Sequence, residues 1–357
     1  MAISLNLSLV YNIFERRLVQ FLILFFIVLM VYNHRIIIKL KQTGTLLRPS
    51  GSLVKQSSTS SKQSGTVRNH TGTVLTMSTT FKSDPAKYQI YANTLQNWAI
   101  LQPRVKLILF TYETDENLIK LAESLGWLIV ECPRVTSFKV PYFKEMIHES
   151  QKHSKSLFYG FANGDVLFDE GLVNTLDAME KYLDYLGDVL VVGQRYDVPS
   201  KDREFYKHTD VQYIVHKEGK LSLPYAMDYF FFAHNRFVWD KVVDVIIGRP
   251  WYENYLVMMA IDNNIPVVDA TQTITCLHQS GSDGNNAGLK NKDTLHFNWK
   301  AIGNFMIRRG FTNSSQYVTK LYGHEIELWQ RTPAKKISPK SKWTHLTKRV
   351  SSIPKVD

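Results

Sequence analysis

The fourteen residues from Ser156 to Asp169 read SLFYGFANGDVLFD, and they decide how the rest of the chain is interpreted. An apolar run ends in Asn163, Gly164 and Asp165, and the apolar character then resumes as VLF. Polar residues that interrupt a buried strand are typical of a sheet that presents side chains to a ligand. The sequence therefore predicts a binding site at this strand end, with Asp165 as its carboxylate.

Strand and helix patterns alternate on both sides of this stretch. Apolar strand patterns alternate with amphipathic helix patterns, and strands that are apolar on both faces indicate a largely parallel sheet covered by helices on both sides. We expect strands at 73–79, 105–112, 127–133, 155–165 and 188–195, and helices at 86–101, 115–126, 141–154 and 171–183. Ligands of such α/β folds bind where the carboxyl ends of the strands meet.

The chain changes character after residue 195. Residues 223–234 form a strand pattern with Asp228 near its start, 249–264 is helix-like, and 265–286 ends in a polar, glycine-rich loop. A Rossmann-like first half is thus followed by a mixed second half that has room for a second substrate.

The net charge of +11 is carried by the two ends of the chain. Residues 1–75 have a net charge of +8 and residues 331–357 of +7, which leaves −4 for residues 76–330. A mildly acidic body argues against a groove for a phosphate backbone, so we expect no nucleic-acid partner. The two cysteines, Cys132 and Cys276, exclude a disulfide scaffold and a four-thiolate zinc site; a single disulfide and two buried thiols both remain open.

Residues 18–38 form an apolar segment of 21 residues, long enough to cross a bilayer of about 30 Å. A cleaved signal peptide is the alternative, but no small-x-small cleavage site follows the segment. We therefore expect a cytoplasmic tail at 1–17 and a single-pass type II signal-anchor at 18–38, with the body in the lumen. A flexible stem rich in Ser, Thr and Gly follows at 39–73.

The two ends of the body are marked by composition. The globular domain is expected at 74–330, and residues 331–357 form a basic, proline-containing tail that we expect to be disordered. Asn69 and Asn313 each begin an N-glycosylation acceptor pattern, which is compatible with a glycoprotein of the secretory pathway.

The order of four segments carries a family resemblance. These are NGD at 163–165, MDYFFF at 227–232, GRPWYENYLV at 248–257 and VVDATQTITCLHQ at 267–279. In this order the chain resembles the nucleotide-diphospho-sugar transferase superfamily, the glycosyltransferases of the GT-A fold, over about residues 73–300. The resemblance implies a single GT-A domain, a nucleotide-sugar donor, and a location in the Golgi or endoplasmic reticulum membrane.

In the GT-A family the strand end carries an Asp-x-Asp motif that holds a divalent ion, usually Mn²⁺ or Mg²⁺, against the donor diphosphate. The leaving diphosphate gains negative charge, which a hard cation with oxygen ligands stabilises. Here the first acid is replaced by Asn163, so Asp165 is the sole carboxylate, and metal dependence stays open. The resemblance implies that Asn163 and Asp165 bind the donor, with Asn163 hydrogen-bonded to a ribose hydroxyl or to the phosphates. The resemblance implies His278 as a second metal ligand, whereas a strand-capping histidine and an Asx turn at Asp165 are the structural alternatives.

Two further acids are candidates for chemistry. An inverting transferase needs a carboxylate that deprotonates the acceptor hydroxyl, and Asp228 and Glu253 are both placed for it. Glu253 is flanked by aromatic residues suited to a sugar ring, although an acid at a helix N-terminus is also stabilised by the dipole. Thr79 and Thr80 end the first strand, where GT-A folds contact the nucleotide.

The sequence therefore predicts a hexosyl- or pentosyltransferase that moves a sugar from a nucleotide diphosphate to a hydroxyl of a glycan or glycoprotein. Two alternatives stay open. One is a non-catalytic, membrane-tethered sugar- or partner-binding relative on the same scaffold, which Asn163 favours. The other is a nucleotidyl- or phosphate-group transferase, because one fold can host several activities.

Overall fold

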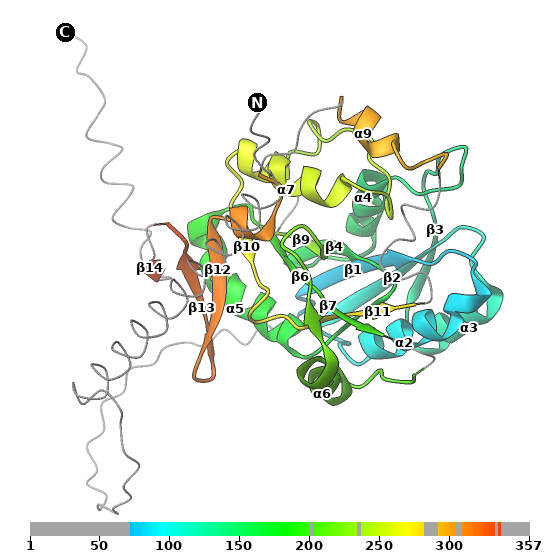
Figure 1. Ribbon diagram of the computed structural model, residues 1–357, viewed down its shortest axis with the longest axis horizontal. Helices are drawn as coiled ribbons and strands as arrows, with labels where there is room; N and C mark the ends of the chain where they lie inside the picture. Colours follow the sequence, from blue (N-terminus) through cyan, green and yellow to red (C-terminus); the bar gives the residue numbers. More distant parts are fainter. Residues whose placement is uncertain are drawn as a thin grey trace, which may run out of the picture. The chain divides into compact units, whose positions relative to one another are not determined.

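The computed structural model describes residues 72–199, 203–233, 237–281, 292–303, 309–332 and 335–336 (Figure 1). The expected cytoplasmic tail, signal-anchor and most of the stem lie outside these residues. Within the described part of the chain, no helix has both the length and the apolar character needed to span a bilayer. The described residues therefore give no support to the predicted single-pass type II topology, and the Golgi or endoplasmic reticulum localisation that depended on it is not retained.

A ten-stranded sheet forms the centre of the domain. Its strand order is β14-β13-β12-β10-β6-β9-β4-β1-β2-β3 (Figure 1). The strands on the β3 side are β1 (Leu75–Thr80), β2 (Val105–Thr111), β3 (Leu128–Glu131), β4 (Phe158–Ala162) and β9 (Met227–Ala233). The remaining strands are β6 (Leu190–Gln194), β10 (Val267–Asp269), β12 (Tyr317–Tyr322), β13 (Glu325–Gln330) and β14 (Lys335–Lys336).

The expected parallel sheet is confirmed for the first half of the chain. Strand β1 pairs in parallel with β2 and with β4, and β2 pairs in parallel with β3. Helices connect these strands, as parallel neighbours require. They are α2 (Tyr88–Ala99), α3 (Glu116–Ser124) and α4 (Phe143–His153); the next helix, α5 (Gly171–Leu186), leads from β5 to β6.

Strand β9 is the exception that shapes the site. It lies between β4 and β6 and runs antiparallel to both. Its first residues therefore lie at the same edge as the last residues of β4 and β6. All seven residues of β9 are buried, because its FFF run contacts helices on both faces of the sheet.

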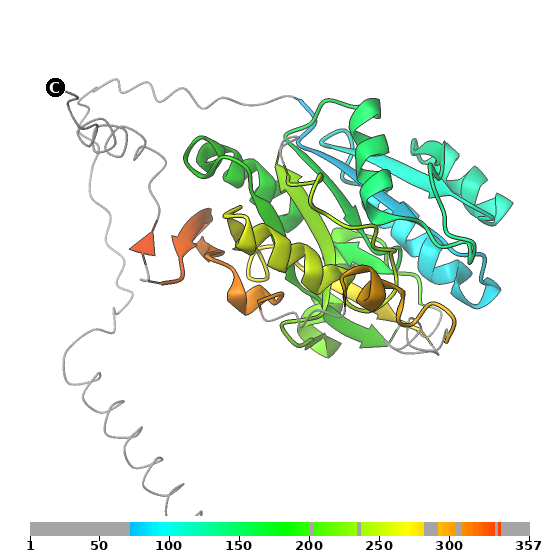
Figure 2. The ribbon, with the colours of Figure 1, turned by 90° about the horizontal axis from the view of Figure 1, so that it is seen from above.

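Apolar clusters on the two faces of the sheet account for its burial. One cluster packs α2, α3 and α5 against the sheet, and includes the stacked pair Trp98 and Trp127. The other packs α4, residues 237–247 and α7 (Tyr252–Asp262) against the opposite face. The view from above shows α7 crossing the strands, with the short helix α9 (Phe297–Ala301) beside it (Figure 2).

A second sheet of four strands, in the order β5-β11-β7-β8, lies beside the carboxyl ends of the main strands. Its strands are β5 (Val166–Phe168), β7 (Tyr196–Pro199), β8 (Lys220–Leu221) and β11 (Cys276–Ser280). Helix α6 (His208–Glu218) packs on this sheet through a small cluster that includes Val211 and Leu277. Cys132 and Cys276 are both buried and unpaired.

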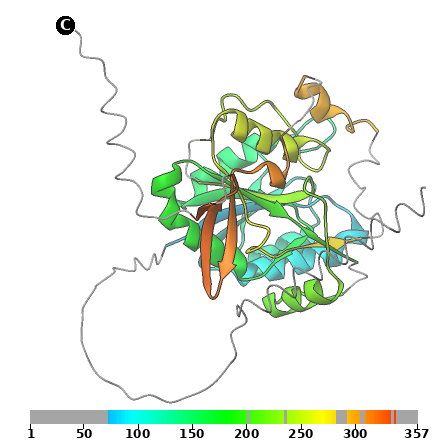
Figure 3. The same cartoon turned by 60° about the vertical axis from the view of Figure 1, so that its left-hand side comes forward.

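The C-terminal strands extend the main sheet as a hairpin. Strands β12 and β13 pair in antiparallel register and project from the sheet (Figure 3). The first residues of the expected tail belong to this fold, because Arg331 forms an ion pair with Asp269 and Lys335–Lys336 pairs with β13. Asn313, in the 3-10 turn η3 (Thr312–Ser314), is exposed, whereas Asn69 lies outside the described residues.

Candidate functional site

The turn at Asn163, Gly164 and Asp165 joins β4 to β5. The amide of Val166 donates to the Asn163 carbonyl at 3.4 Å, so the strand end is closed by a backbone-to-backbone turn. A Cβ on Gly164 would lie 2.7 Å from the Phe81 ring, which shows that glycine is needed for packing against the end of β1. Glycine at position 164 is therefore required by a close contact within the protein.

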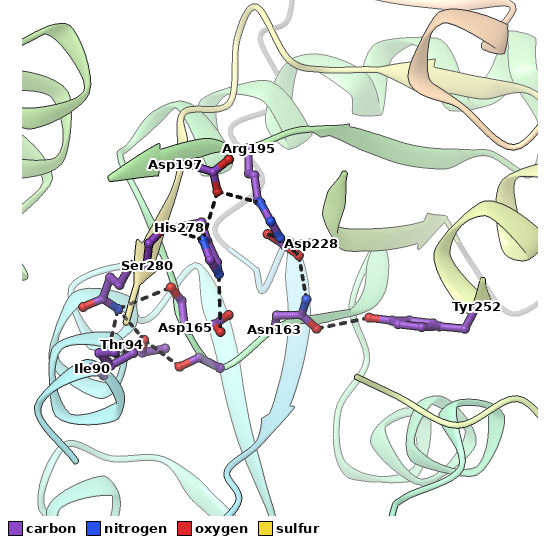
Figure 4. A network of polar contacts seen from close by, with 12 residues as sticks. Ile90, Thr94, Asn163, Asp165, Arg195, Asp197, Asp228, Tyr252, His278 and Ser280 are labelled. Atoms are coloured by element: carbon purple, nitrogen blue, oxygen red, sulfur yellow. Dashed lines mark hydrogen bonds and ion pairs between the residues drawn. The ribbon is translucent and has the colours of Figure 1, made fainter. Parts of the chain in front are cut away.

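His278 lies between two carboxylates. In β11 it is aligned with Asp197 of the neighbouring parallel strand β7, and on its other side with Val166 of β5, which directly follows Asp165. The Nδ1 atom of His278 is 3.1 Å from Asp197 Oδ1, and Nε2 is 3.5 Å from Asp165 Oδ2 (Figure 4). The register of the small sheet thus brings together residues that are 81 and 113 positions apart.

This arrangement keeps His278 charged. Burial opposes protonation, but the charge of Asp165 and the hydrogen bonds to both carboxylates raise the pKa of His278 to about 9. Burial alone would raise the pKa values of Asp165 and Asp197. The interactions with the His278 imidazolium outweigh the effect of burial, and each pKa is lowered to about 2. At neutral pH the group is a cation between two anions.

Arg195 extends the group toward β9. Its Nε atom donates to Asp197 Oδ1 at 3.0 Å, and its Nη1 atom donates to both oxygens of Asp228 at 3.0 and 2.8 Å. Asp228 is 2% exposed, and it reaches this position because antiparallel β9 begins where β6 ends. Burial lowers the pKa of Arg195, but Asp228 and Asp197 raise it overall.

Asn163 is held at both ends of its amide. Its Nδ2 atom donates to Asp228 Oδ1 at 2.6 Å, and its Oδ1 atom accepts from the Tyr252 hydroxyl at 3.1 Å (Figure 4). Within the described structure these contacts use its side chain to connect β4, β9 and α7. Asn163 therefore orders the site through contacts within the protein, and its expected contact with a donor ribose or phosphate stays a prediction.

The six residues Asn163, Asp165, Arg195, Asp197, Asp228 and His278 form one connected set, here called the charge network. Three carboxylates face two cations in it, which leaves one net negative charge. Its components come from the ends of β4 and β6, the start of β9 and the small sheet. The structure thus joins Asp165, His278 and Asp228, which lie far apart in the sequence.

Glu253 lies in the first turn of α7, one residue after Tyr252. Burial raises the pKa of Glu253 to about 8, and the nearby charge of Asp228 adds to this shift while Arg195 opposes it. A carboxyl group with a pKa near neutral pH is suited to proton transfer. Asp228 is occupied by Arg195 and Asn163, so Glu253 is the better placed of the two predicted catalytic acids.

Thr79 and Thr80 are not part of the charge network. The hydroxyl of Thr79 is fully buried and has no hydrogen-bond partner among the described residues. Thr80 is partly exposed at the end of β1, where its carbonyl is close to Gly164. The structure therefore leaves only Thr80 of this pair with access to a ligand near the strand ends.

The fit of a divalent ion depends on Asp165 and His278. The Oδ1 atom of Asp165 is buried and, within the described chain, has no hydrogen-bond partner, as expected for an oxygen that awaits a cation. The described residues contain no cluster of three His, Cys, Asp or Glu side chains able to hold a metal. Asp165 thus fits as one ligand, and His278 fits as a second once its Nε2 atom has lost its proton, in a set that a bound diphosphate would have to complete.

Arg195, Asp197 and Tyr252 were not among the predicted site residues. Arg195 is the last residue of the expected strand 188–195 and Asp197 follows two residues later, so their position at a strand end was a usable signal. Their ion pairs depend on the antiparallel placement of β9 and on the register of β7 with β11, which local sequence does not encode. Tyr252 resembles an ordinary core residue of an amphipathic helix, and nothing in the sequence indicates its bond to Asn163.

No family model and no curated protein matches this chain. Several solved structures resemble it. A mannosyltransferase from Pyrobaculum calidifontis in complex with GDP-Man and Mn²⁺ is 11% identical, with a TM-score of 0.39 and coverage of 67% of each chain. Glucosyl-3-phosphoglycerate synthase from Mycobacterium tuberculosis, in complex with Mn²⁺, UDP and phosphoglyceric acid, is 12% identical with a TM-score of 0.37; the match covers 72% of this chain and 87% of that one.

Staphylococcus aureus TarS 1–349 in complex with UDP-GlcNAc is 11% identical, with a TM-score of 0.27. The match covers 35% of each chain, so this protein spans about a third of that structure. Proteins that bind nucleotide sugars thus recur among the structures similar to this chain. Because the identities and TM-scores are low, we base no inference on these likenesses, and the proposals below rest on the residues of the site.

Proposed function

We propose that this protein is a glycosyltransferase that moves a sugar from a nucleotide-diphosphate donor to a hydroxyl group of a glycan or glycoprotein. The observation that supports this most is the Asp165 oxygen that is buried without a partner beside His278, next to the carboxyl ends of parallel strands. Such edges are where α/β folds bind their ligands. The charge network supplies both an imidazolium and a free carboxylate oxygen at this point.

The diphosphate of the donor is the group that this part of the site suits best. His278 and Arg195 are cations in a largely buried setting, where charge stabilisation is stronger than in water. A divalent ion, Mn²⁺ or Mg²⁺, would be held by Asp165 and by the neutral ring of His278, whose Nε2 proton would leave as the ion binds. When bound, such an ion supplies positive charge against the leaving diphosphate. Asn163 and Asp228 act as positioning residues, since each is committed to contacts within the protein.

Glu253 is proposed as the base. In the transfer, the acceptor oxygen bonds to C1 of the donor sugar while the bond from C1 to the diphosphate oxygen breaks. The electron pair of that bond leaves with the nucleoside diphosphate, and the acceptor proton moves to the ionised Glu253 carboxylate. Direct displacement of this kind inverts the configuration at C1. The raised pKa of Glu253 makes its carboxylate a stronger base than an ordinary glutamate.

The test is nucleotide release by the full chain. The protein is incubated with UDP- and GDP-sugars, Mn²⁺ or Mg²⁺, and a panel of glycan and glycoprotein acceptors, and nucleotide and product are measured. We expect the wild type to release nucleotide and to transfer the sugar, and Asp165→Ala to lose both activities. The control Asp177→Ala, at a surface ion pair with Arg104, should retain them. Binding without turnover would favour a non-catalytic relative. No binding of any nucleotide sugar would reject the donor site itself.

A further inference from the structure

A second group of side chains lies next to Glu253 and outside the charge network. Trp251 precedes α7, and its backbone has a φ of +84°. The left-handed region is rarely adopted by a bulky residue, because its side chain is strained there. Trp251 is also 40% exposed, whereas Trp98, Trp127 and Trp239 are buried. A strained and exposed tryptophan beside a proposed base is therefore held in place by its surroundings.

Asn298 of α9 provides much of that support. It is fully buried, and its Oδ1 atom accepts from the amide of Ile246 at 2.8 Å. Its Nδ2 atom donates to the carbonyls of Ile246, Arg249 and Pro250, at 2.9, 3.2 and 3.2 Å. These four contacts attach the loop before α7 to α9. The conformation of Trp251 is thus fixed by a buried side chain on another element.

Trp299, the next residue of α9, packs against Trp251. Their ring centroids are 5.1 Å apart and the planes are inclined by 51°. We call Trp251 and Trp299 the aromatic platform. Aromatic faces carry partial negative charge and attract the C–H groups on the flat face of a sugar ring, which are weakly positive. The platform therefore has the chemistry of a sugar-binding surface.

Arg249 adds a charge beside the platform. Its Nε atom donates to the Thr294 hydroxyl, and its Nη1 atom donates to the Gly248 carbonyl at 2.7 Å. The guanidinium is half-buried, burial lowers its pKa, and no acidic side chain of the described residues forms an ion pair with it. Carboxylates pair with the guanidinium groups of Arg104, Arg134, Arg195, Arg203 and Arg331.

We propose that Trp251, Trp299 and Arg249 form the acceptor subsite, and that it binds a sugar ring bearing an anionic group. The proposal rests on the transferase function proposed above, and it names the class of acceptor. The sugar ring would lie on the platform, and its carboxylate, sulfate or phosphate would pair with the guanidinium fork. Glu253, two residues after Trp251 in the chain, would then lie near a hydroxyl of the same acceptor.

Matched sugars test this subsite without any transfer reaction. Methyl glucuronide and methyl glucoside differ in the charged group at C6, and the 6-sulfate and 6-phosphate of methyl glucoside distinguish the kinds of anion. Binding to the full chain is measured by ligand-observed NMR and by tryptophan fluorescence. We expect at least one anionic sugar to bind about 10-fold more tightly than the glucoside, since a hydrogen bond between two charged groups is stronger than one between neutral groups.

Variants of Arg249 and Trp251 separate the contribution of the positive charge to sugar binding from that of the aromatic ring. Arg249→Gln is expected to bring the ratio of affinities for anionic and neutral sugars close to 1, and Arg249→Lys to keep part of the preference. Trp251→Ala is expected to weaken the binding of neutral and anionic sugars alike. Arg134→Gln, at an exposed ion pair, is the control and should behave as the wild type. Equal binding of all the sugars by the wild type, or an unchanged preference in Arg249→Gln, would overturn the proposal.

The donor site gives an independent readout. If nucleotide sugars bind normally and no anionic sugar is preferred, the acceptor proposal fails and the transferase proposal stands. If the anionic preference is found but no nucleotide sugar binds, the transferase proposal fails and the subsite stands as a glycan-binding surface. Donor affinity should be the same in Arg249→Gln and in the wild type.

Discussion

The charge network contacts Tyr252, the first residue of α7, the aromatic platform includes Trp251, the residue before it, and the two regions are built in opposite ways. Charges in the network are paired and largely buried, and they come from strand ends in two sheets. The platform and Arg249 come from a loop and a short helix, and they present an exposed ring and a cation without an acidic partner among the described residues. The network suits a fixed, strongly charged group, whereas the platform suits a larger and more variable ligand.

Tyr252 and Glu253 connect the two regions. Tyr252 reaches Asn163 of the network through its hydroxyl, while the residue before it carries the platform. Glu253 lies within the electrostatic influence of Asp228 and Arg195. A transfer reaction needs a proton acceptor between its two substrates, and Glu253 is the residue whose place and pKa agree with that need. Variants that change only the charge network or only the aromatic platform test whether the two regions have separate roles.

The largest expected effect is at Glu253. Glu253→Gln should lower kcat by about 10²–10⁴-fold, the usual contribution of a general base, with donor affinity unchanged. In the wild type, kcat should rise with pH and level off above about 8, because only the ionised carboxylate accepts the proton. Initial rates from pH 5 to 9 check both statements. A variant with wild-type rates would remove Glu253 from the chemistry.

The same residue gives a stability signature. The folded pKa of Glu253, about 8, is above its ordinary value of 4.5, so folding favours the protonated form. Its favourable contribution is therefore complete below pH 4.5 and is lost as the pH rises through about 8. Urea unfolding should show the wild type losing stability relative to Glu253→Gln across this window. Parallel pH dependences for the two proteins would contradict the burial of this carboxyl group.

The second-largest effect is expected on the free energy of unfolding when the charge network is broken. Arg195→Gln leaves Asp228 as a buried carboxylate without its cation, and breaking such a pair costs about 3–5 kcal/mol of unfolding free energy. Arg134→Gln removes an exposed pair and should cost no more than about 1 kcal/mol. Urea unfolding at pH 7 measures both. Similar values for the two variants would show that the network is less buried than described.

A smaller effect is expected where the sequence departs from the GT-A pattern. Asn163→Asp restores the first acid of the motif, but it removes the donor to Asp228 and places two carboxylates about a hydrogen bond apart. We expect a loss of about 1–3 kcal/mol and no gain in affinity for Mn²⁺. Unfolding and metal titration check this. Tighter metal binding would identify Asn163 as a lost ligand and not a positioning residue.

The smallest effect on stability is expected at the platform. Trp251→Gly removes a ring that is 40% exposed but also relieves the left-handed backbone, so the two changes oppose each other. The unfolding free energy should change by less than about 1 kcal/mol, as is usual at exposed sites. Acceptor binding should nevertheless be lost. A large destabilisation would show that Trp251 is structural.

Local sequence was enough to predict the parallel half of the sheet and the place of Asp165. Apolar strands and amphipathic helices have clear periods, and a polar turn after FYGFA marks a strand end. The antiparallel direction of β9 was not predictable, because a strand buried on both faces has the same pattern in either direction. The pairing of Arg195 with Asp228, and of Trp251 with Trp299, depends on contacts between distant segments. These contacts decide which predicted residues are free to act.

The central claim is that Asp165 and His278 bind the diphosphate of a nucleotide sugar. Calorimetric titration of the full chain with UDP- and GDP-sugars in the presence of Mn²⁺ tests it most directly. We predict saturable binding of at least one donor by the wild type and by Asp177→Asn, and at least about 10-fold weaker binding by Asp165→Asn, as expected when a charged contact is lost. Equal affinity in Asp165→Asn and the wild type, or no binding of any donor, would contradict the claim.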